Sequence, residues 1–542
     1  MPFRLRRAPL IVRRIMTSVT PRSPPSPPAA PTEKKMRMQE EGIRTAPSKQ
    51  DRQAAKRDRK RIHYLQKAYQ KQVSKQGDPP ILFDIIEMLG KERVDTILQR
   101  KEEFDRVKPF GEEVTVTIER LSSHGDGLAR SPEGDRVLVV PFCLPGEVVR
   151  VVPYGAERLH FKSRLVERVG GHSPMRNDEL VQCRYFGQCG GCQYQMIPYE
   201  TQLELKKSVV EKAFAHFSKL DKSLVPDVLP TVGSPKVMQY RTKLTPHFDL
   251  PHALRRKSKT KNVDVGTLSV PIGFDNVNTG HVMDIEECPI GTPTINAQMP
   301  SEYAKVRANI QHYKNGATLL LRDSLADLQP ETIEAQKSVV VTDHHATVYE
   351  TVGDIQFSTP AGAFFQNNRS IIPLVIEYVK EQVLAQDKGK PRYLVDTYCG
   401  SGLFALSLAS LFHEVAGVEI SASSIECAKQ NAALNQITNA QFLAGSAENI
   451  FASISYPPEQ TTVVIDPPRR GCDQPFLDQL VALRPRNIVY VSCNVHTQAR
   501  DVGALLRACP SYVIDSVRGF DFFPQTHHVE GVCVLHNKDY VL

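Results

Sequence analysis

The 542-residue chain has no long uninterrupted hydrophobic run. A helix that crosses a bilayer needs about 20 mostly apolar residues. The most apolar stretches here, such as YLVDTYCGSGLFALSLASLF, are broken by Asp, Gly and Ser. We therefore expect no membrane segment and a soluble protein. Hydrophobic residues still make up 41% of the chain, which permits ordinary packed cores in about two to four domains.

A secretory signal pattern and dense cysteine pairing are also missing. The chain has eleven cysteines, spread over its whole length. This usage argues against a disulfide scaffold and favours a reducing compartment. In such a protein, a few of the cysteines are expected to ligate a metal or to act in catalysis.

Acidic residues do not occur before Glu33, whereas six arginines fall within residues 1–22. Residues 1–77 hold 20 Lys and Arg against 5 Asp and Glu, a net charge of +15, and the rest holds 48 against 55, a net charge of −7. This composition is typical of a mitochondrial transit peptide or of a disordered basic arm, and KRDRKR at 56–61 resembles a nuclear address. We expect a mitochondrial location, a nuclear–cytoplasmic one, or both. A basic tail also attracts polyanions such as RNA.

Patterns of polarity divide the chain into five parts. Residues 1–77 are predicted to be a disordered basic tail, with a proline-rich linker after the arginines. Residues 78–108 have apolar side chains at three- and four-residue spacing and predict a short helical segment. Alternation over 109–170, as in VTVTIERL, predicts a small OB-like β-barrel. Residues 171–350 are predicted to form an α+β central domain, and residues 351–542 an α/β domain.

Four cysteines have the spacing of metal ligands. Cys183, Cys189 and Cys192 form a C-x5-C-x2-C run, and Cys288 follows much later, directly before a proline. Three clustered cysteines with a distant Cys-Pro are one style of iron–sulfur ligation. Four thiolates would equally hold tetrahedral zinc. The spacing leaves both metals open, and it does not imply redox chemistry.

The α/β part begins with an apolar strand, a glycine turn and a helix. Asp396 closes the strand, Gly400 and Gly402 open the turn, and a second strand ends at Glu419, about twenty residues later. In a doubly wound sheet, an acid at that place binds ribose hydroxyls. The full G-x-G-x-x-G pattern is absent, which favours S-adenosylmethionine over a dinucleotide, because S-adenosylmethionine has no pyrophosphate. The domain is therefore predicted to be a Rossmann-like methyltransferase.

Two later strands end in reactive groups. TTVVIDPPRRG delivers Asp466, and IVYVSCNVHTQARD delivers Cys493. Ligands of parallel sheets bind at the carboxyl ends of the strands. A lone cysteine is more often a small buried side chain. Its place at this end of a strand favours a chemical role for Cys493.

Together, PAGAFFQNN, DTYCGSGLF, IDPPRRG, VSCNV and HHVE resemble, in order, the catalytic motifs of the RNA uracil-C5 methyltransferase family, and the resemblance covers roughly residues 110–542. The predicted barrel resembles that family's TRAM domain, and the four cysteines resemble the cluster site of many members. The sequence is most similar to eukaryotic, fungal-like members that methylate uridine 54 of tRNA.

The resemblance implies a role for each matched position. It makes Cys493 the nucleophile and Glu530 the general base, and it makes Gln366, Tyr398, Glu419 and Asp466 contacts to S-adenosylmethionine or the target base. It implies a [4Fe-4S] cluster, with zinc as the alternative, on Cys183, Cys189, Cys192 and Cys288. Leu403 departs from the family, since many members have Asn there, and the loop is expected to close by apolar packing instead.

The chemistry gives these roles a reason. Addition of a thiolate to carbon 6 of uracil makes carbon 5 nucleophilic, and a base must later remove the carbon-5 proton. Gln366, or Arg469 at a distance, is a candidate donor to the uracil O4. We expect tRNA as the partner and a monomer without an obligate protein partner. The same chemistry on a ribosomal RNA uridine, or an RNA-binding or chaperone role without essential turnover, remain the alternatives.

Overall fold

The computed structural model describes residues 48–106, 110–250, 270–326, 328, 337–385, 392–445, 451 and 454–540. The chain divides into two compact units, residues 1–61 and 62–542. The predicted transit segment and the proline-rich linker lie outside the described residues. Among the described residues, no helix is both long enough and apolar enough to cross a bilayer.

Helix α1 (Lys49–Gln76) corrects the prediction of a disordered tail through residue 77. The segment contains no Gly or Pro, and it is rich in Lys, Arg, Gln and Ala, which favour helix formation. High charge by itself does not prevent a helix. The high helix propensity of these residues outweighs the repulsion between their charges.

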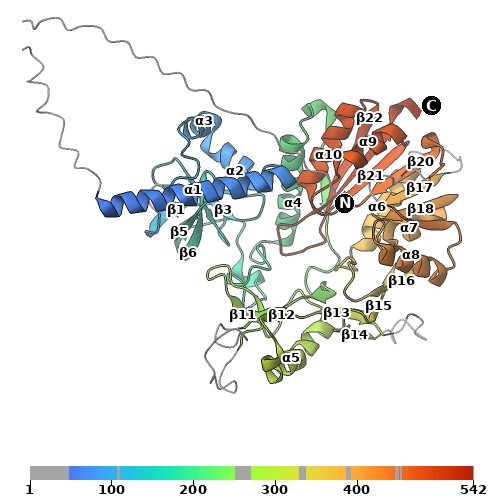
Figure 1. Ribbon diagram of the computed structural model, residues 1–542, viewed down its shortest axis with the longest axis horizontal. Coiled ribbons are helices and arrows are strands. Elements are labelled where there is room, and N and C mark those ends of the chain that lie inside the picture. Colours follow the sequence, from blue (N-terminus) through green and yellow to red (C-terminus); the bar gives the residue numbers. More distant parts are fainter. Residues whose placement is uncertain are drawn as a thin grey trace, which may run out of the picture. The chain divides into compact units, whose positions relative to one another are not determined.

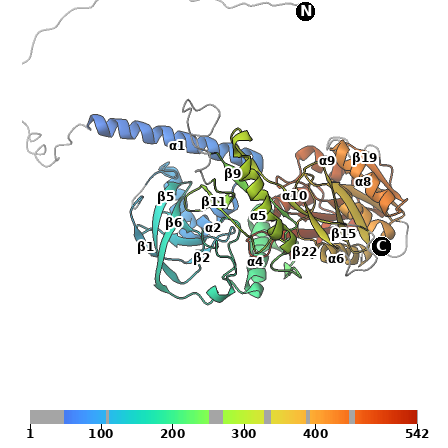
Figure 2. The same cartoon turned by 90° about the horizontal axis from the view of Figure 1, so that it is seen from below.

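Two helices, α2 (Pro80–Leu89) and α3 (Lys91–Gln99), lie within the range 78–108 where a helical segment was predicted. Gly90, with a φ of 83°, separates them. A six-stranded sheet follows where the small β-barrel was predicted, in the order β1-β5-β6-β4-β3-β2. Its strands are β1 (Val114–Thr117), β2 (Arg120–Leu121), β3 (Gly127–Arg130), β4 (Val137–Val140), β5 (Glu147–Ala156) and β6 (His160–Gly171). Figure 2 shows this sheet with α2 beside it, and Leu82 and Ile85 share a buried cluster with barrel residues.

The central region combines short strands with two helices, as the α+β prediction requires. The helices are α4 (Tyr199–Phe217) and α5 (Pro293–Ala308). The strands form three small sheets, in the orders β11-β10-β9-β12, β14-β13-β8 and β15-β16. Their bounds are β8 (Lys243–Leu244), β9 (His247–Asp249), β10 (Gly273–Asp275), β11 (Val282–Asp284), β12 (Gly316–Thr318), β13 (Leu321–Leu325), β14 (Ser338–Val341), β15 (Thr347–Val352) and β16 (Ile355–Pro360).

An eight-stranded sheet forms the last part, in the order β19-β18-β17-β20-β21-β23-β22-β7. Its strands are β7 (Leu229–Val232), β17 (Tyr393–Thr397), β18 (Glu414–Glu419), β19 (Ala440–Ala444), β20 (Thr461–Ile465), β21 (Asn487–Ser492), β22 (Tyr512–Phe520) and β23 (Glu530–Asn537). The central region therefore contributes an edge strand, because β7 pairs in parallel with β22.

Helices cover both faces of this sheet (Figure 1), so the predicted Rossmann-like α/β fold is confirmed. They are α6 (Ile372–Ala385), α7 (Leu403–Leu408), α8 (Ala422–Leu434), α9 (Gln474–Leu483) and α10 (Val495–Ala508). Along each strand the side chains alternate: Val464 and Val489 join the cluster under α6, α7 and α8, whereas Ile465 and Ile488 join the cluster under α4, α9 and α10.

Candidate active site

Four neighbouring strands bring polar side chains to one edge of the sheet. Glu419 ends β18, Asp466 directly follows β20, and Cys493 directly follows β21. These strands run parallel to β17, which lies between β18 and β20. Since the carboxyl ends of parallel strands meet at one edge, the structure brings these three predicted residues to the same side of the sheet.

Glu530 reaches this edge from the opposite direction. It begins β23, which is antiparallel to β21, and Ser492 pairs with Gly531. One further step along both strands places Cys493 opposite Glu530. Gly531 is required for close packing here, because a Cβ would lie 2.5 Å from Oε1 of Gln498 on α10.

Burial and nearby acids raise the pKa of both Cys493 and Glu530. Burial, followed by the charges of Glu530 and Asp466, raises the pKa of the half-buried Cys493 thiol to about 12. Burial and Asp466 raise the pKa of Glu530 well above its usual value. Glu530 is only 1% exposed, and neither of its carboxylate oxygens has a hydrogen-bond partner among the described residues. Both Glu530 oxygens could therefore accept hydrogen bonds from a polar ligand.

Arg469 supplies the opposing charge. Its guanidinium lowers the pKa of Cys493, both by charge and by a side-chain hydrogen bond, and it lowers the pKa of Glu530. Asn494, next to the cysteine, donates to the Arg469 carbonyl at 2.8 Å. The sequence pointed to Arg469 only as a distant donor, and the structure places it beside the thiol.

Asp396 is a buried acid that the predicted site residues leave out. Its Oδ2 accepts the Ala405 N–H at 2.8 Å, whereas Oδ1 has no partner among the described residues. Burial, Asp466 and Glu419 raise the pKa of Asp396 to about 8, and burial raises that of Asp466 to about 7. Three acids thus gather where strands β17, β18 and β20 end. Its place at the end of a strand, before a glycine turn, was the sequence signal that could have found Asp396.

The turn after β17 has the backbone conformation that its glycines predict. Gly400 and Gly402 have positive φ values of 53° and 92°, and Gly402 caps α7. Tyr398 has a φ of 61°, which is uncommon for a bulky residue, and its ring packs 5.3 Å from that of Phe476. Leu403 packs against the hydrophobic core, as expected from its departure from the family.

Gln366 is the predicted site residue with the fewest contacts to the other predicted site residues among those that the structure describes. It lies half-buried in the loop before α6. Two residues later, Asn368 donates to the Phe522 carbonyl at 3.2 Å, close to the end of β22. Among the described residues, Gln366 makes no hydrogen bond to another predicted site residue.

The strand-end site suits a cationic, polar cofactor. Burial raises the pKa of its acids, and the nearby Asp466 raises the pKa of Asp396 and of Glu530 further. A ligand with a positive sulfonium and an ammonium group would relieve this repulsion, and the free oxygens of Asp396 and Glu530 would accept hydrogen bonds. The residues present therefore fit S-adenosylmethionine.

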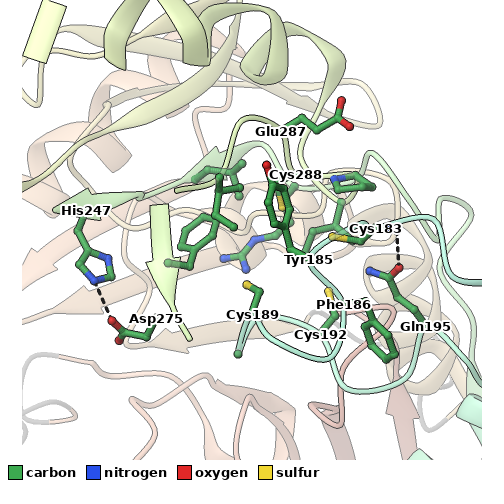
Figure 3. Close-up of a pocket in the computed structure, with 18 residues that line it drawn as sticks. Cys183, Tyr185, Phe186, Cys189, Cys192, Gln195, His247, Asp275, Glu287 and Cys288 are labelled. Carbon is green, nitrogen blue, oxygen red and sulfur yellow. Dashed lines mark hydrogen bonds and ion pairs between the residues drawn. The ribbon is translucent and has the colours of Figure 1, made fainter. Parts of the chain in front are cut away.

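The four predicted metal ligands line one cavity of about 310 Å³. Figure 3 shows Cys183, Cys189 and Cys192 on one loop, with Cys288 reaching the same cavity from another segment. Burial raises the pKa of all four thiols, to about 12 for Cys192 and about 11 for Cys288. Within the part of the chain that the structure describes, no three His, Cys, Asp or Glu side chains are gathered closely enough to hold a metal ion.

The cysteine cavity nevertheless has the right kind of donors. Four thiolates together need a cation to offset their repulsion. Arg241 also lines the cavity, its Nε has no partner among the described residues, and its charge lowers the pKa of Cys288. A positive side chain beside four thiols favours an anionic thiolate–metal centre. The donor chemistry therefore fits a metal, although the four sulfurs are not drawn together.

Comparisons with known proteins agree with this geometry. Residues 334–538 match the family model described as tRNA (Uracil-5-)-methyltransferase, and residues 110–152 match the TRAM domain. A tRNA (uracil(54)-C(5))-methyltransferase of Schizosaccharomyces pombe is 48% identical over 435 residues, 78% of each chain. Its namesake from Saccharomyces cerevisiae is 39% identical, covering 78% of this chain and 73% of that one.

A solved structure is also similar. The Pyrococcus abyssi tRNA (uracil-54, C5)-methyltransferase in complex with S-adenosyl-L-homocysteine covers 78% of this chain and 100% of its own, with a TM-score of 0.55 and 22% identity. At this identity the likeness supports the fold.

Proposed function

The chain belongs to the tRNA (uracil-5-)-methyltransferase family, and from this premise we propose that it methylates carbon 5 of a uridine in tRNA, at position 54, with S-adenosylmethionine as the methyl donor. The observation that carries the proposal is the placement of Cys493 opposite Glu530 at the carboxyl edge of the sheet. A thiol and a carboxyl group on opposite strand ends are what addition to a pyrimidine ring and later proton removal require.

Cys493 begins the reaction. The sulfur bonds to carbon 6 of the uracil, and the ring becomes an enolate with electron density at carbon 5. This step needs a thiolate. In the free protein Arg469 is the group that stabilises the Cys493 thiolate against burial and the neighbouring acids. The target base must leave its stack to reach the thiol.

Glu530 completes the reaction. After carbon 5 has taken the methyl group, Glu530 removes the proton from that carbon. The released electron pair re-forms the carbon 5–carbon 6 double bond, and the bond to sulfur breaks. Glu530 is well placed to accept this proton, because both of its oxygens lack protein partners among the described residues. Its burial also limits the access of water.

S-adenosylmethionine supplies an electrophilic methyl group when it is bound. Tyr398, Glu419 and Asp466, with Gln366 from the preceding loop, would hold it. The strand-end acids would offset its positive charge, and the glycine turn would let the backbone approach it.

Methyl transfer from labelled S-adenosylmethionine to unmodified tRNA and to ribosomal RNA tests the proposal, with wild type beside Cys493→Ala. Label at carbon 5 of tRNA uridine 54, absent with the variant, is expected. Label found only on ribosomal RNA would show that the substrate is ribosomal RNA instead of tRNA. Both proteins could instead be folded, bind the cofactor and promote RNA folding without methylating either RNA. That result would contradict the enzymatic function and favour the chaperone role.

We also propose that the four-cysteine cavity holds a [4Fe-4S] cluster. The four thiols of one cavity and the adjacent Arg241 support an anionic metal centre. Protein purified without oxygen should absorb broadly into the visible range and contain about four iron atoms per chain. A colourless protein with one zinc would instead support the tetrahedral alternative.

Location and assembly remain proposals of the same kind. The arginine-rich residues 1–22 support a mitochondrial address, and the basic stretch at 56–61 supports a nuclear one. Reporter fusions of each segment would separate the two. We further propose that the protein works as a monomer on tRNA, and sedimentation of the protein with and without tRNA tests this.

A further inference from the structure

The loop that leads into Glu530 is largely buried and is held by contacts with two other parts of the chain. It runs from Asp521 to Val529, between β22 and β23. Asp521 and Lys206 of α4 form a fully buried ion pair, and the Lys206 ammonium also donates to the Phe523 carbonyl at 3.0 Å. Tyr199, on the same helix, donates to the second Asp521 oxygen at 2.9 Å. Helix α4 therefore fixes the start of the loop.

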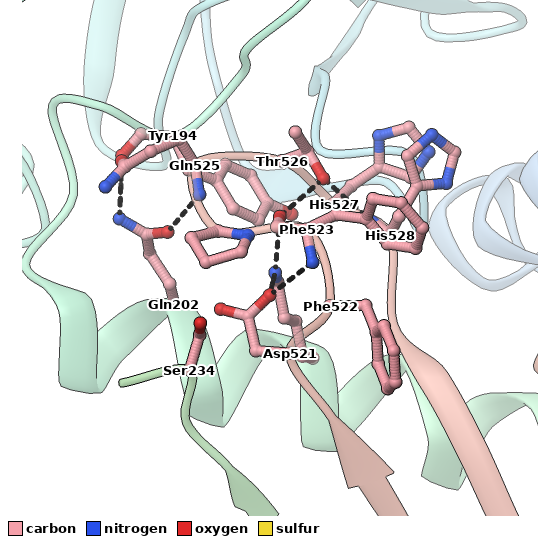
Figure 4. Close-up of polar contacts among 12 residues, drawn as sticks. Tyr194, Gln202, Ser234, Asp521, Phe522, Phe523, Gln525, Thr526, His527 and His528 are labelled. Carbon is pink, nitrogen blue, oxygen red and sulfur yellow. Dashed lines mark hydrogen bonds and ion pairs between the residues drawn. The ribbon is translucent and has the colours of Figure 1, made fainter. Parts of the chain in front are cut away.

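Gln525 anchors the middle of the loop in a strained conformation. Its φ of 70° lies in the left-handed region, which costs energy for a residue with a side chain. Figure 4 shows Gln525 facing Gln202. Gln202 Nε2 donates to Gln525 Oε1 at 3.1 Å, and the Gln525 N–H donates to Gln202 Oε1 at 3.1 Å. This reciprocal pair offsets the strain.

The cysteine loop holds the same residue from the other side. The N–H groups of Gln193 and Tyr194, which directly follow Cys192, both donate to the Gln525 carbonyl, at 2.9 and 3.0 Å. The side chain of Gln193 makes a second link. Its Nε2 donates to the Gly190 carbonyl at 3.2 Å. Its Oε1 accepts the His527 N–H at 3.4 Å and lies 3.3 Å from His527 Nδ1.

These contacts connect the cysteine loop with the loop that leads into Glu530. Gly190 lies between Cys189 and Cys192, and His527 lies three residues before Glu530. The chain from the cysteine loop to the base is therefore short: Gly190, Gln193, His527, Glu530. The first two links are hydrogen bonds, and the last is the short stretch of backbone from His527 to Glu530 at the start of β23. Displacement of the cysteine loop must change the support of Glu530.

We propose that Gln193 and Gln525 are positioning residues for Glu530, and that through them the packing of the cysteine loop sets the rate of the proton-removal step. The inference rests on the proposed methyltransferase function and adds a part to it. The cysteine loop then contributes to catalysis without touching the reacting atoms. Its effect is confined to the late step, because Cys493 is carried by β21, which these hydrogen bonds do not reach.

The chemistry supplies a readout specific to this step. When Glu530 is displaced, the proton stays on carbon 5, the sulfur–carbon 6 bond cannot break, and protein stays covalently bound to methylated RNA. Addition of the thiolate does not require Glu530 in that position. A displaced base should therefore leave adduct formation in place and slow adduct release. A general loss of stability would slow both.

The experiment uses the full chain, labelled tRNA and S-adenosylmethionine, and it measures both turnover and the covalent adduct on a denaturing gel. Gln193→Ala removes only the side-chain bridge of a half-buried residue, so the variant should fold. We expect turnover to fall about 10-fold, a fraction of the effect of losing a general base, and the adduct to accumulate several-fold. The matched control is Gln188→Ala, an exposed position in the same loop, which should behave as wild type.

Gln525→Ala is the second variant, and it should give the same pattern more strongly, because it removes the buried side-chain oxygen that accepts from Gln202 Nε2. Unchanged kinetics for Gln193→Ala, or a parallel fall of adduct formation and release in either variant, would overturn the inference while wild-type turnover upholds the proposed function. Wild-type protein that transfers no methyl group would overturn the proposed function itself. Should Gln525→Ala fail to fold, the result with Gln193→Ala decides.

Discussion

Cys493 and Glu530 face each other across the pairing of β21 and β23, one residue beyond the Ser492–Gly531 pair. Backbone hydrogen bonds of the sheet, rather than a flexible loop, therefore set their relative position. Two neighbouring side chains shift the pKa of the Cys493 thiol in opposite directions, because Glu530 raises it and Arg469 lowers it. The ionisation of the Cys493 thiol therefore depends on both neighbouring side chains.

Glu530→Gln should separate the two halves of the reaction. The amide has the same shape as the buried acid, and it cannot take the proton from carbon 5. We expect the variant to fold, to form the covalent adduct with tRNA and to release product about 10²–10⁴-fold more slowly. A shifted protein–RNA band on a denaturing gel measures this. Normal turnover would mean that another group is the base.

The sheet and its strand-end residues could be predicted from the sequence, because the signals are local. Apolar strands that end in Asp466 or Cys493, and the glycine turn at Gly400 and Gly402, each occupy a few consecutive positions. The rule that parallel strands present their carboxyl ends together then assembles the site.

Other features depend on contacts distant in sequence and could not be predicted. The partnership of Gln202 with Gln525 joins residues 323 positions apart. Strand β7 pairs with β22 from the far side of the central region. Helix α1 was missed for a different reason, since its charge obscured a good helix propensity.

Arg469→Met should make Cys493 less reactive. The guanidinium lowers the pKa of the thiol through its charge and a hydrogen bond, and methionine has a similar length without either. We expect alkylation of Cys493 by iodoacetamide to slow and to need a higher pH, because the thiolate is the reactive form.

Peptide mass spectrometry can follow Cys493 separately from the other ten cysteines. Arg469→Lys keeps the charge and should recover part of the rate, which distinguishes charge from packing. An unchanged pH profile in Arg469→Met would show that this charge does not govern the thiol.

Asp396→Asn should flatten the pH dependence of stability. The folded-state pKa of Asp396 is raised to about 8, whereas an unfolded Asp titrates near about 4. Because the folded state binds this proton more tightly, the stability that it contributes is present below about pH 4 and is lost as the pH rises through about 8.

The amide does not ionise, and its oxygen still accepts the Ala405 N–H. Wild type should therefore lose about 4 kcal/mol of unfolding free energy relative to the variant between pH 5 and 8. Urea unfolding at several pH values measures this difference. Parallel curves for the two proteins would contradict the raised pKa.

Gly531→Ala should disturb the site through packing alone. A Cβ at Gly531 would lie 2.5 Å from Gln498 Oε1 and 2.8 Å from Val495 Cγ1. Gln498 is fixed in turn, because its Nε2 donates to the Tyr490 and Gly531 carbonyls at 2.7 and 3.0 Å. Either α10 or the start of β23 must move, which should cost about 1–3 kcal/mol.

Since Glu530 and Cys493 directly adjoin these two elements, activity should fall by more than the loss of folded protein explains. Methylation rates at a temperature where the variant is fully folded, with folding checked by circular dichroism, test this. Gly170→Ala is the control, because a Cβ there has no atom within 4 Å. If Gly531→Ala lowers the melting temperature but leaves the rate per folded molecule intact, then the strand register positions Cys493 and Glu530 with more tolerance than the close packing of α10 implies.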